Sequence, residues 1–480
     1  MRTPASYETA QHGGDVRRIL WAQGTRAFAY GLAALLLGTT LDRLGLSGVE
    51  AGGVLAAVVG GTALASVAVA RLGDNVGRRR MYLVFSLFLG ASGLIFAYAD
   101  AWWLLVLAAL TGTVSTEVVG SGPFVSLEQA MLAAEPEGRR RLQGFGLYNA
   151  VAAGAGALGA LALGAPGLLR RFIPGLPVDQ RFFLVLVVAA AAGALCVSRL
   201  SPAVEAQGRG RIAPDRRSGR SGGLRGSRAV VARLASLLAL DSLAGGFVVQ
   251  AFLAYWFTSQ FHASPGELGV LFFAVGVVQT ASFLVAPRLG SRFGLLTTMV
   301  GTHLPSNLLL AAVPLAPTFA GAAGLLIARS ALSQMDVPLR QAYVVALVDP
   351  SERTAAIGYT NAVRYLTRPV GPLVAGASVA VLPGLPFFLA GALKIVYDLS
   401  LWAWFRHVPL VESEKVYGPA EERRRPTVDL GVGQSDRGDP PRTARPRDQS
   451  PAASPAPVIP VPSTNGTPTP GREADDSRRR

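Results

Sequence analysis

The chain is poor in cysteine, histidine and charge. Cys196 is its only cysteine, and the 480 residues include four histidines, so no intramolecular disulfide can form and no Cys/His set has zinc-site spacing. Charged residues make up 16% of the chain, against about 25% in soluble domains. The sequence also lacks a glycine-rich loop ending in Lys-Ser/Thr and any serine-histidine-carboxylate set. These absences argue against ATP-driven function and against an enzyme, and they predict no cofactor and no metal.

Long apolar runs fill most of the remaining sequence. Half of the residues are hydrophobic, and a membrane span needs roughly 20 apolar residues. The first run is interrupted by Arg26 and lacks a signal-peptide cleavage pattern, so it is expected to be retained as a span. The sequence predicts an all-α integral membrane protein with twelve spans, the longest of which must include turns at a membrane face. They lie near residues 18–40, 49–70, 81–99, 102–133, 143–165, 182–199, 231–257, 267–288, 294–314, 318–347, 355–382 and 386–405.

The net charge of +15 is not spread as in a nucleic-acid-binding protein. Arginines gather in alternate loops, which by the positive-inside rule are cytoplasmic. An even number of spans then places both termini in the cytoplasm of a multi-pass protein of the plasma (inner) membrane, with the lipid bilayer as its surroundings and no nucleic acid partner. The basic loops contain Arg71 with Arg78 to Arg80, Arg139 to Arg141, the stretch 199–233, Arg288 with Arg292, and Arg353.

Two stretches, 120–164 and 329–376, are similar to each other. Each contains a charged residue followed by Gln-Ala, then an acidic turn with proline, and then Asn-Ala. The charged residue is Glu128 in the first stretch and Arg340, 212 positions later, in the second. At the same offset Asn149 is matched by Asn361. Because the copies follow in the same order, the sequence predicts two parallel repeats of six spans each, which form two six-helix bundles.

The charges of the two repeats have opposite signs at matched positions. Besides Glu128 and Arg340, Glu117 is matched by Arg329 at the offset of 212, and Arg26 is matched by Asp241 at an offset of 215. All of them lie in apolar sequence. Bare charges in lipid are costly, so these side chains are expected to face a cavity or one another.

Composition divides the rest of the chain. The stretch between the repeats is rich in Gly, Arg and Ser, which is typical of a flexible linker. The C-terminal stretch turns to Pro, Arg, Asp, Ser and Thr and cannot bury enough apolar surface to fold. The predicted segments are a cytoplasmic N-terminus (1–17), a first bundle (18–199), a basic cytoplasmic linker (200–230), a second bundle (231–406) and a mostly disordered cytoplasmic tail (407–480).

The loop after the second predicted span carries a recognisable motif. It runs from Arg71 to Arg80 and contains Gly73, Asp74, Gly77 and Arg78. This loop resembles the signature loop of the major facilitator superfamily, in which a glycine, an acidic residue and a second glycine precede a basic run. A weaker copy occupies 290–294, with serine in place of the acidic residue. The resemblance extends over about residues 15–406 through the motif, the number of spans and the order of the repeats.

The resemblance implies two bundles around a central cavity, lined by the first, fourth, seventh and tenth spans, and alternating access by rocking of the bundles. The candidate residues of the substrate and coupling cavity are Arg26, Glu117, Asp241, Arg329 and Asp336. Candidates for an inner gate, nearer the cytoplasm, are Asp74, Glu128, Arg340 and Arg364. Arg364 and Arg368 are further cations that would attract an anionic substrate or contact the Asp74 loop; for Arg364 the loop contact is favoured.

The pseudo-twofold axis suggests a specific hypothesis about these charges. Repeat-related positions lie opposite each other across the cavity, so salt bridges could form between the bundles in one access state. The three candidate pairs are Arg26 with Asp241, Glu117 with Arg329, and Glu128 with Arg340. The alternative, kept open here, is that each charge is paired within its own bundle.

The sequence as a whole predicts a secondary active transporter of a small solute that works by alternating access, with export favoured. A proton is the candidate coupling ion, and Asp241 is the favoured carrier because Gly245 and Gly246 let the seventh span bend or pack closely beside it. The alternative is a transporter-like sensor or scaffold that acts through its C-terminal tail. The oligomeric state is not indicated by the sequence.

Overall fold

The computed structural model describes residues 4–116, 122–132, 139–165, 167, 170, 172, 180–201, 227–348 and 352–408. Within these ranges the side chains at 4–13, 74, 139–146, 345 and 353–355 are not described. One compact unit comprises 1–425, and the second, 426–480, lies outside the described residues. The described elements are all helices, in agreement with the fold class predicted from the apolar runs.

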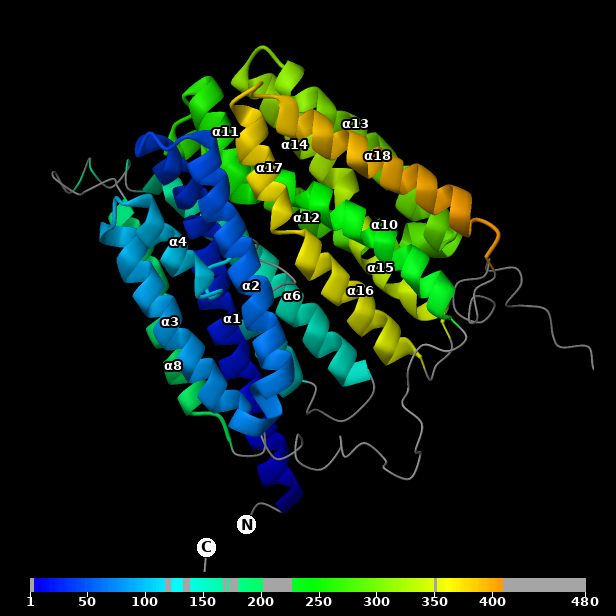
Figure 1. Ribbon diagram of the computed structural model, residues 1–480. Coiled ribbons are helices and arrows are strands. Elements are labelled where there is room, and N and C mark those ends of the chain that lie inside the picture. Colours follow the sequence, from blue (N-terminus) through cyan, green and yellow to red (C-terminus); the bar gives the residue numbers. More distant parts are fainter. Residues whose placement is uncertain are drawn as a thin grey trace, which may run out of the picture. The chain divides into compact units, whose positions relative to one another are not determined.

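The first repeat forms the N-terminal bundle, coloured blue to green-cyan in Figure 1. It consists of α1 (Pro4–Arg43), α2 (Gly48–Val76), α3 (Arg78–Tyr98), α4 (Trp102–Leu110), α5 (Pro123–Leu132), α6 (Arg139–Leu161), the 3-10 turns η1 (Ala162–Gly164) and η2 (Gln180–Phe183), and α8 (Leu184–Ser198). The helix α1 begins well before the predicted start of the first span at residue 18, so part of the segment expected as a cytoplasmic N-terminus continues the first helix.

The second repeat forms the C-terminal bundle, coloured green to orange in Figure 1. It consists of α10 (Arg228–Phe247), α11 (Gln250–Phe261), α12 (Pro265–Phe293), α13 (Leu295–Ala312), the 3-10 turn η3 (Val313–Leu315), α14 (Phe319–Ser333), α15 (Asp336–Ala346), α16 (Arg353–Thr367), α17 (Val370–Val379) and α18 (Leu385–Phe405).

Seven helical segments of the described chain are long and apolar enough to cross a membrane. The other five predicted spans coincide with α1, which carries Arg26, with α13, and with three pairs of shorter helices: α4 and α5, α14 and α15, and α16 and α17. The pairs arise because the chain breaks inside an apolar run; between α4 and α5, for example, Gly112 and Gly122 have positive φ angles of 71° and 117°. The turns within the two longest runs were expected at a membrane face; in the described residues the helices instead break in the middle of those runs, at 111–112 and at 334–335.

The local geometry repeats between the bundles. Gly77 ends α2 with φ 97°, and Gly294 ends α12 with φ 86°, a region that favours glycine because other residues carry a clashing Cβ. At the start of the same two helices, Ser47 with Glu50 and Ser264 with Glu267 form capping boxes. The three pairs share one offset of 217 residues, which supports the duplication predicted from sequence.

The bundles approach each other closely at one end, where α1 passes into α2 and α11 into α12; we call this the closed end. Here α1 packs on α11, α2 on α17, and α6 on α12. One buried apolar cluster is continuous across both bundles and includes Leu37, Leu41, Phe252 and Phe257. A second cluster belongs to the C-terminal bundle alone. We call the opposite end, with the turns at Gly77 and Gly294, the basic end.

Small residues make the contact at the closed end possible. A Cβ added to Gly52 of α2 would lie 2.5 Å from the carbonyl oxygen of Pro372 in α17, and one added to Gly376 would lie 2.1 Å from the oxygen of Gly48. On α1, a Cβ at Gly38 would lie 2.2 Å from the oxygen of Ala251. The backbones of the two bundles are therefore in direct contact, as in small-residue interfaces between membrane helices.

Candidate functional site: a cavity between the two bundles

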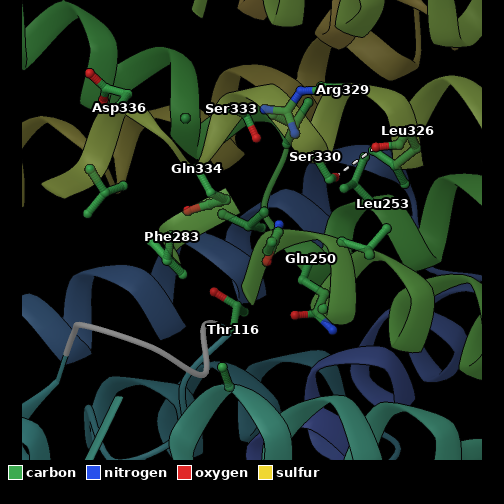
Figure 2. A pocket seen from close by; sticks show the side chains of 18 of the residues that line it. Thr116, Gln250, Leu253, Phe283, Leu326, Arg329, Ser330, Ser333, Gln334 and Asp336 are labelled. Carbon is green, nitrogen blue, oxygen red and sulfur yellow. Dashed lines mark hydrogen bonds between the residues drawn. The ribbon is translucent and has the colours of Figure 1, made fainter. Parts of the chain in front are cut away.

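A cavity of about 390 Å³ lies between the bundles, and both contribute to its walls. The N-terminal bundle supplies only small or uncharged residues among those described: Thr116, Ala153, Gly156, Ala157 and Ala160. Figure 2 shows Thr116 on this side, with Arg329, Ser330 and Ser333 on the side of the C-terminal bundle. A volume of this size is within the range of about 300–1,000 Å³ typical of small-molecule sites.

Interrupted helices shape the C-terminal wall. The seventh predicted span is broken at Val248 and Val249, the tenth at Gln334 and Met335, and the eleventh near Arg368. Residues on both sides of the breaks in the seventh and tenth spans line the cavity, including Gln250 and Gln334. Irregular backbone is tolerated within a membrane where it lines a cavity, because polar groups can there be satisfied by solvent or ligand.

The charges of the cavity all come from the C-terminal bundle within the described residues. Asp241 on α10 accepts a hydrogen bond of 3.1 Å from Arg340 and one of 2.5 Å from Lys394 on α18. Arg340 also pairs with Asp336, one helical turn earlier on α15, at 2.9 Å. Asp241, Asp336, Arg340 and Lys394 are each less than a tenth exposed. Three helices are thus joined by one ionic network at the cavity wall.

Asp241 is held in place by the close packing of its helix. A Cβ added to Gly246 would lie 2.4 Å from the oxygen of Arg368 and 3.0 Å from the Cα of Gly371. The prediction that Gly246 lets the seventh span pack closely next to Asp241 is therefore confirmed, and α10 ends one residue later, at Phe247.

Two further arginines line the cavity without a counter-charge. Within the described part of the chain, neither Arg329 on α14 nor Arg364 on α16 forms an ion pair, and the Nε atom of each is buried without a hydrogen-bond partner. Both side chains are partly buried. Arg368 lines the cavity beside them. Among the described residues, the cavity wall therefore carries five Lys/Arg side chains and two Asp side chains.

A histidine site adjoins this network. His303 on α13 lines the cavity and lies 2.8 Å through Nδ1 from Oδ1 of Asp398 on α18, while Asn307 donates a hydrogen bond of 2.8 Å to the other oxygen of Asp398. The structure therefore gives His303 a carboxylate partner. The three polar side chains are buried together and contact one another, while Oδ1 of Asn307 has no hydrogen-bond partner among the described residues.

The N-terminal bundle contains a matching ion pair away from the cavity wall. Arg26 on α1 donates to Glu128 on α5, and Glu128 also accepts hydrogen bonds from Tyr82 (3.0 Å) and Tyr148 (2.6 Å). Arg26 is 2% exposed and Glu128 is fully buried. The guanidinium also lies 5.1 Å from the ring centre of Phe124, within the range of a cation–π contact.

These contacts place the predicted charges within their own bundles. Arg26 is paired with Glu128, and Asp241 is paired with Arg340; the expected pairs between bundles, Arg26 with Asp241 and Glu128 with Arg340, are not formed in this structure. The sign inversion now has a physical explanation. Each repeat joins its first and fourth spans by one ion pair, and reversing both members leaves that pair neutral.

The predicted site residues therefore fall into three groups. Asp241, Arg329 and Asp336 line the cavity as expected, and Arg340 and Arg364, expected at an inner gate, line it too. Arg26 and Glu128 form the buried pair of the N-terminal bundle, because a buried guanidinium needs a carboxylate and the nearest lies in its own bundle. Glu117 and the side chain of Asp74 lie outside the described residues, and so does any contact between Asp74 and Arg364.

Two functional candidates were missed by sequence reasoning. Lys394 and Asp398 lie on the twelfth predicted span, whereas the intramembrane charges were assigned to four other spans. Both are buried, at 6% and 1% exposure. The signal was present: two charges four residues apart in an otherwise apolar run of 21 residues, a spacing that puts them on one face of a helix.

Comparisons with known proteins agree with this architecture. Residues 234–431 match the family model for the Major Facilitator Superfamily. The chain is 25% identical over 421 residues to the uncharacterized membrane protein YJR124C of Saccharomyces cerevisiae, covering 81% of this chain and 93% of that protein. In fold it is similar to the nucleoside transporter NupG (TM-score 0.64, 13% identity, 82% of this chain and 99% of that one) and to the xylose transporter XylE from E. coli (TM-score 0.62, 13% identity, 83% and 98%).

Proposed function

We propose that this chain belongs to the major facilitator superfamily, as its fold and the match of residues 234–431 support. It is then a secondary active transporter that moves a small solute by alternating access. The observation that carries the proposal is the cavity of about 390 Å³ between two repeats that are in backbone contact at one end. Rocking of one bundle on the other would expose such a cavity to each side of the membrane in turn.

The basic end is the proposed cytoplasmic side. The turns there carry Arg78 to Arg80 and Arg292, and the linker between the repeats adds more arginines, whereas the basic residues of the loops at the closed end are Arg43 and the cluster Arg170, Arg171 and Arg181. This orientation places both termini in the cytoplasm and makes the structure an inward-facing state. The plasma membrane is the proposed location.

A proton is the proposed coupling ion, with Asp241 as its carrier. Asp241 holds Arg340 and Lys394 at the cavity wall. Protonation would remove the charge that holds both cations, so proton binding and release would change which groups face the solute. This link between a proton and the ionic network requires no further cofactor.

Export is the proposed direction. The cavity combines charged side chains of one bundle with small and apolar side chains of the other, and such a site suits solutes with a polar and an apolar part. Solutes of this kind partition into the bilayer and enter cells passively, so an exporter would keep their internal concentration low.

A growth and accumulation panel would test the proposal. Cells that produce the wild-type protein are compared with cells that produce Asp241→Asn at matched membrane levels, for toxic compounds and organic acids. Export predicts resistance and lower accumulation with the wild type only; greater sensitivity with raised accumulation would reverse the direction. If no compound distinguishes the two strains but deletion of 409–480 changes growth, the transporter proposal is replaced by the sensor alternative.

A further inference from the structure

The described residues of the cavity wall carry more positive than negative charge. Asp241 and Asp336 are both engaged, and together they compensate Arg340 and Lys394. Arg329 and Arg364 remain without an anionic partner within the described residues. Charges inside a membrane protein are expected to be paired, because leaving one uncompensated in a low-dielectric interior is costly. The counter-charge that the described residues do not provide can be supplied by the solute.

The two cations without a partner are arginines, and this restricts the kind of anion that could bind them. A guanidinium presents its donors as a planar fork that matches the two oxygens of a carboxylate or phosphate. Arg329 has its Nε buried without a partner, and nearby Ser333 has its hydroxyl buried without one as well. Figure 2 shows these two side chains together on one side of the cavity. The described part of this wall also has one buried acceptor without a donor, Oδ1 of Asp336. Because the unpaired donors outnumber it, the wall fits an acceptor-rich anionic group.

The rest of the cavity wall includes an apolar surface. The described residues of the N-terminal bundle add only Thr116 and small apolar side chains, and the C-terminal bundle adds Leu253, Phe272 and Phe283. An inorganic anion would leave this apolar surface exposed to water, whereas an apolar group attached to the anion would cover it, at a gain of about 0.8 kcal/mol for each buried methylene.

We propose, building on the transporter function above, that the solute is a small organic anion whose charged group binds at Arg329 and Arg364 while its apolar part faces Ala153 and Ala157 on the N-terminal bundle. While Asp241 is ionised, the network of Asp241, Arg340 and Lys394 is internally paired and sets the position of α10, α15 and α18 around this site.

A single reporter cysteine tests the sign of the electrostatic potential in the cavity. This test does not require knowledge of the solute. The chain has one cysteine, so Cys196→Ser gives a background in which Ala153→Cys places one thiol on the cavity wall. The rate of its reaction with anionic sulfonatoethyl methanethiosulfonate is divided by the rate with the cationic trimethylammonioethyl reagent, and the ratio is normalised to that of a free thiol. A cavity of one charge sign raises the local concentration of counter-ions by about tenfold to a thousandfold, so we expect a normalised ratio of about ten or more.

Variants identify which side chains produce this electrostatic potential. Arg329→Gln and Arg364→Gln should each lower the ratio several-fold, and Arg329→Lys, which keeps the charge, should restore most of it. Arg292→Gln, which removes an exposed arginine at the basic end, is the matched control and should change nothing. A normalised ratio at or below one, or a ratio insensitive to both glutamine variants, would overturn the proposal.

Competition separates an organic from an inorganic anion. Acetate, butyrate and hexanoate should slow the modification at successively lower concentrations, about fourfold for each added methylene, while hexylammonium and inorganic phosphate should have little effect. Equal protection by phosphate and hexanoate would assign an inorganic anion, and no protection by any carboxylate would refute the organic anion.

The same thiol distinguishes failure of this inference from failure of the proposed function. In a transporter it reacts with reagent added to whole cells and with reagent added to inverted vesicles, whatever the preferred charge. Reaction from one side only, under all conditions, would contradict alternating access; reaction from both sides with a preference for the cationic reagent would contradict only the organic anion.

Discussion

Two adjacent glycines of α2 should differ sharply in their tolerance of a single methyl group. A Cβ at Gly52 would lie 2.5 Å from the oxygen of Pro372 and 3.0 Å from the Cα of Gly376, both on the other bundle, whereas a Cβ at Gly53 would meet nothing within 4 Å. Gly52→Ala and Gly53→Ala change helix propensity equally. Any difference between them therefore reports the contact between α2 and α17.

The size of the effect follows from the clash. Carbon–oxygen contacts between packed helices are about 3.3 Å or longer, so α2 and α17 would have to separate by about 0.8 Å in Gly52→Ala. Overpacking of this kind costs about 1–3 kcal/mol, and each 1.4 kcal/mol is a factor of ten in an equilibrium. The clash destabilises only the state in which the closed end is closed. The population with that end open should rise by about 5-fold to 140-fold.

Cysteine modification provides the assay. In the Cys196→Ser, Ala153→Cys background, an impermeant thiol reagent added to whole cells reaches the cavity only when the closed end opens. We expect the reaction in Gly52→Ala to be faster by the factor above, and in Gly53→Ala to be within about twofold of the parent. Equal rates for the two variants at matched membrane levels would refute the conclusion that this glycine contact closes the cavity.

Three further predictions concern stability, measured by thermal unfolding of the purified protein. Arg26→Ala and Glu128→Ala should each lower the free energy of unfolding by about 3–5 kcal/mol, because each leaves a buried charge without its partner. The exchange Arg26→Glu with Glu128→Arg should recover most of this loss, since the second repeat already has this polarity. A double variant no more stable than either single variant would contradict the pairing. Lys394→Met and Asp241→Asn should destabilise less together than the sum of their separate effects, because they share one contact; strict additivity would rule out the contact. Ser47→Ala should cost about 1 kcal/mol by removing the N-cap of α2 without changing accumulation of any solute, and an unchanged unfolding temperature would exclude the capping box.

Much of the fold could be predicted because its signals are local. The glycines at 77 and 294 and the basic residues beside them mark equivalent turns, and the structure gives both glycines positive φ angles. Span length and apolarity identified the transmembrane segments because the bilayer imposes both. The breaks within the fourth and tenth predicted spans could not be found this way, since hydropathy measures transfer into lipid and is insensitive to whether the helix is continuous.

The sequence predicted which charged residues belong to the candidate site better than it predicted which of them are in contact. Asp241, Arg329 and Arg340 were identified because a charge in apolar sequence is conspicuous. The repeat shows which positions are equivalent, and equivalence says nothing about which side chains touch. The contact between Arg26 and Glu128 joins residues 102 positions apart and depends on how two helices of one bundle pack. Lys394 was overlooked because the alignment of the two repeats supplied no partner for it.

Alternating access requires that this structure is one of two states related by rocking of the bundles. Pulsed electron paramagnetic resonance tests it with two pairs of spin labels in the Cys196→Ser background: Val49 with Val381 at the closed end, and Arg80 with Phe293 at the basic end, all exposed positions. We predict that Gly52→Ala lengthens the first distance and shortens the second, while Gly53→Ala changes neither. Distances that remain fixed in both variants, or that change in the same direction at both ends, would contradict alternating access by this protein.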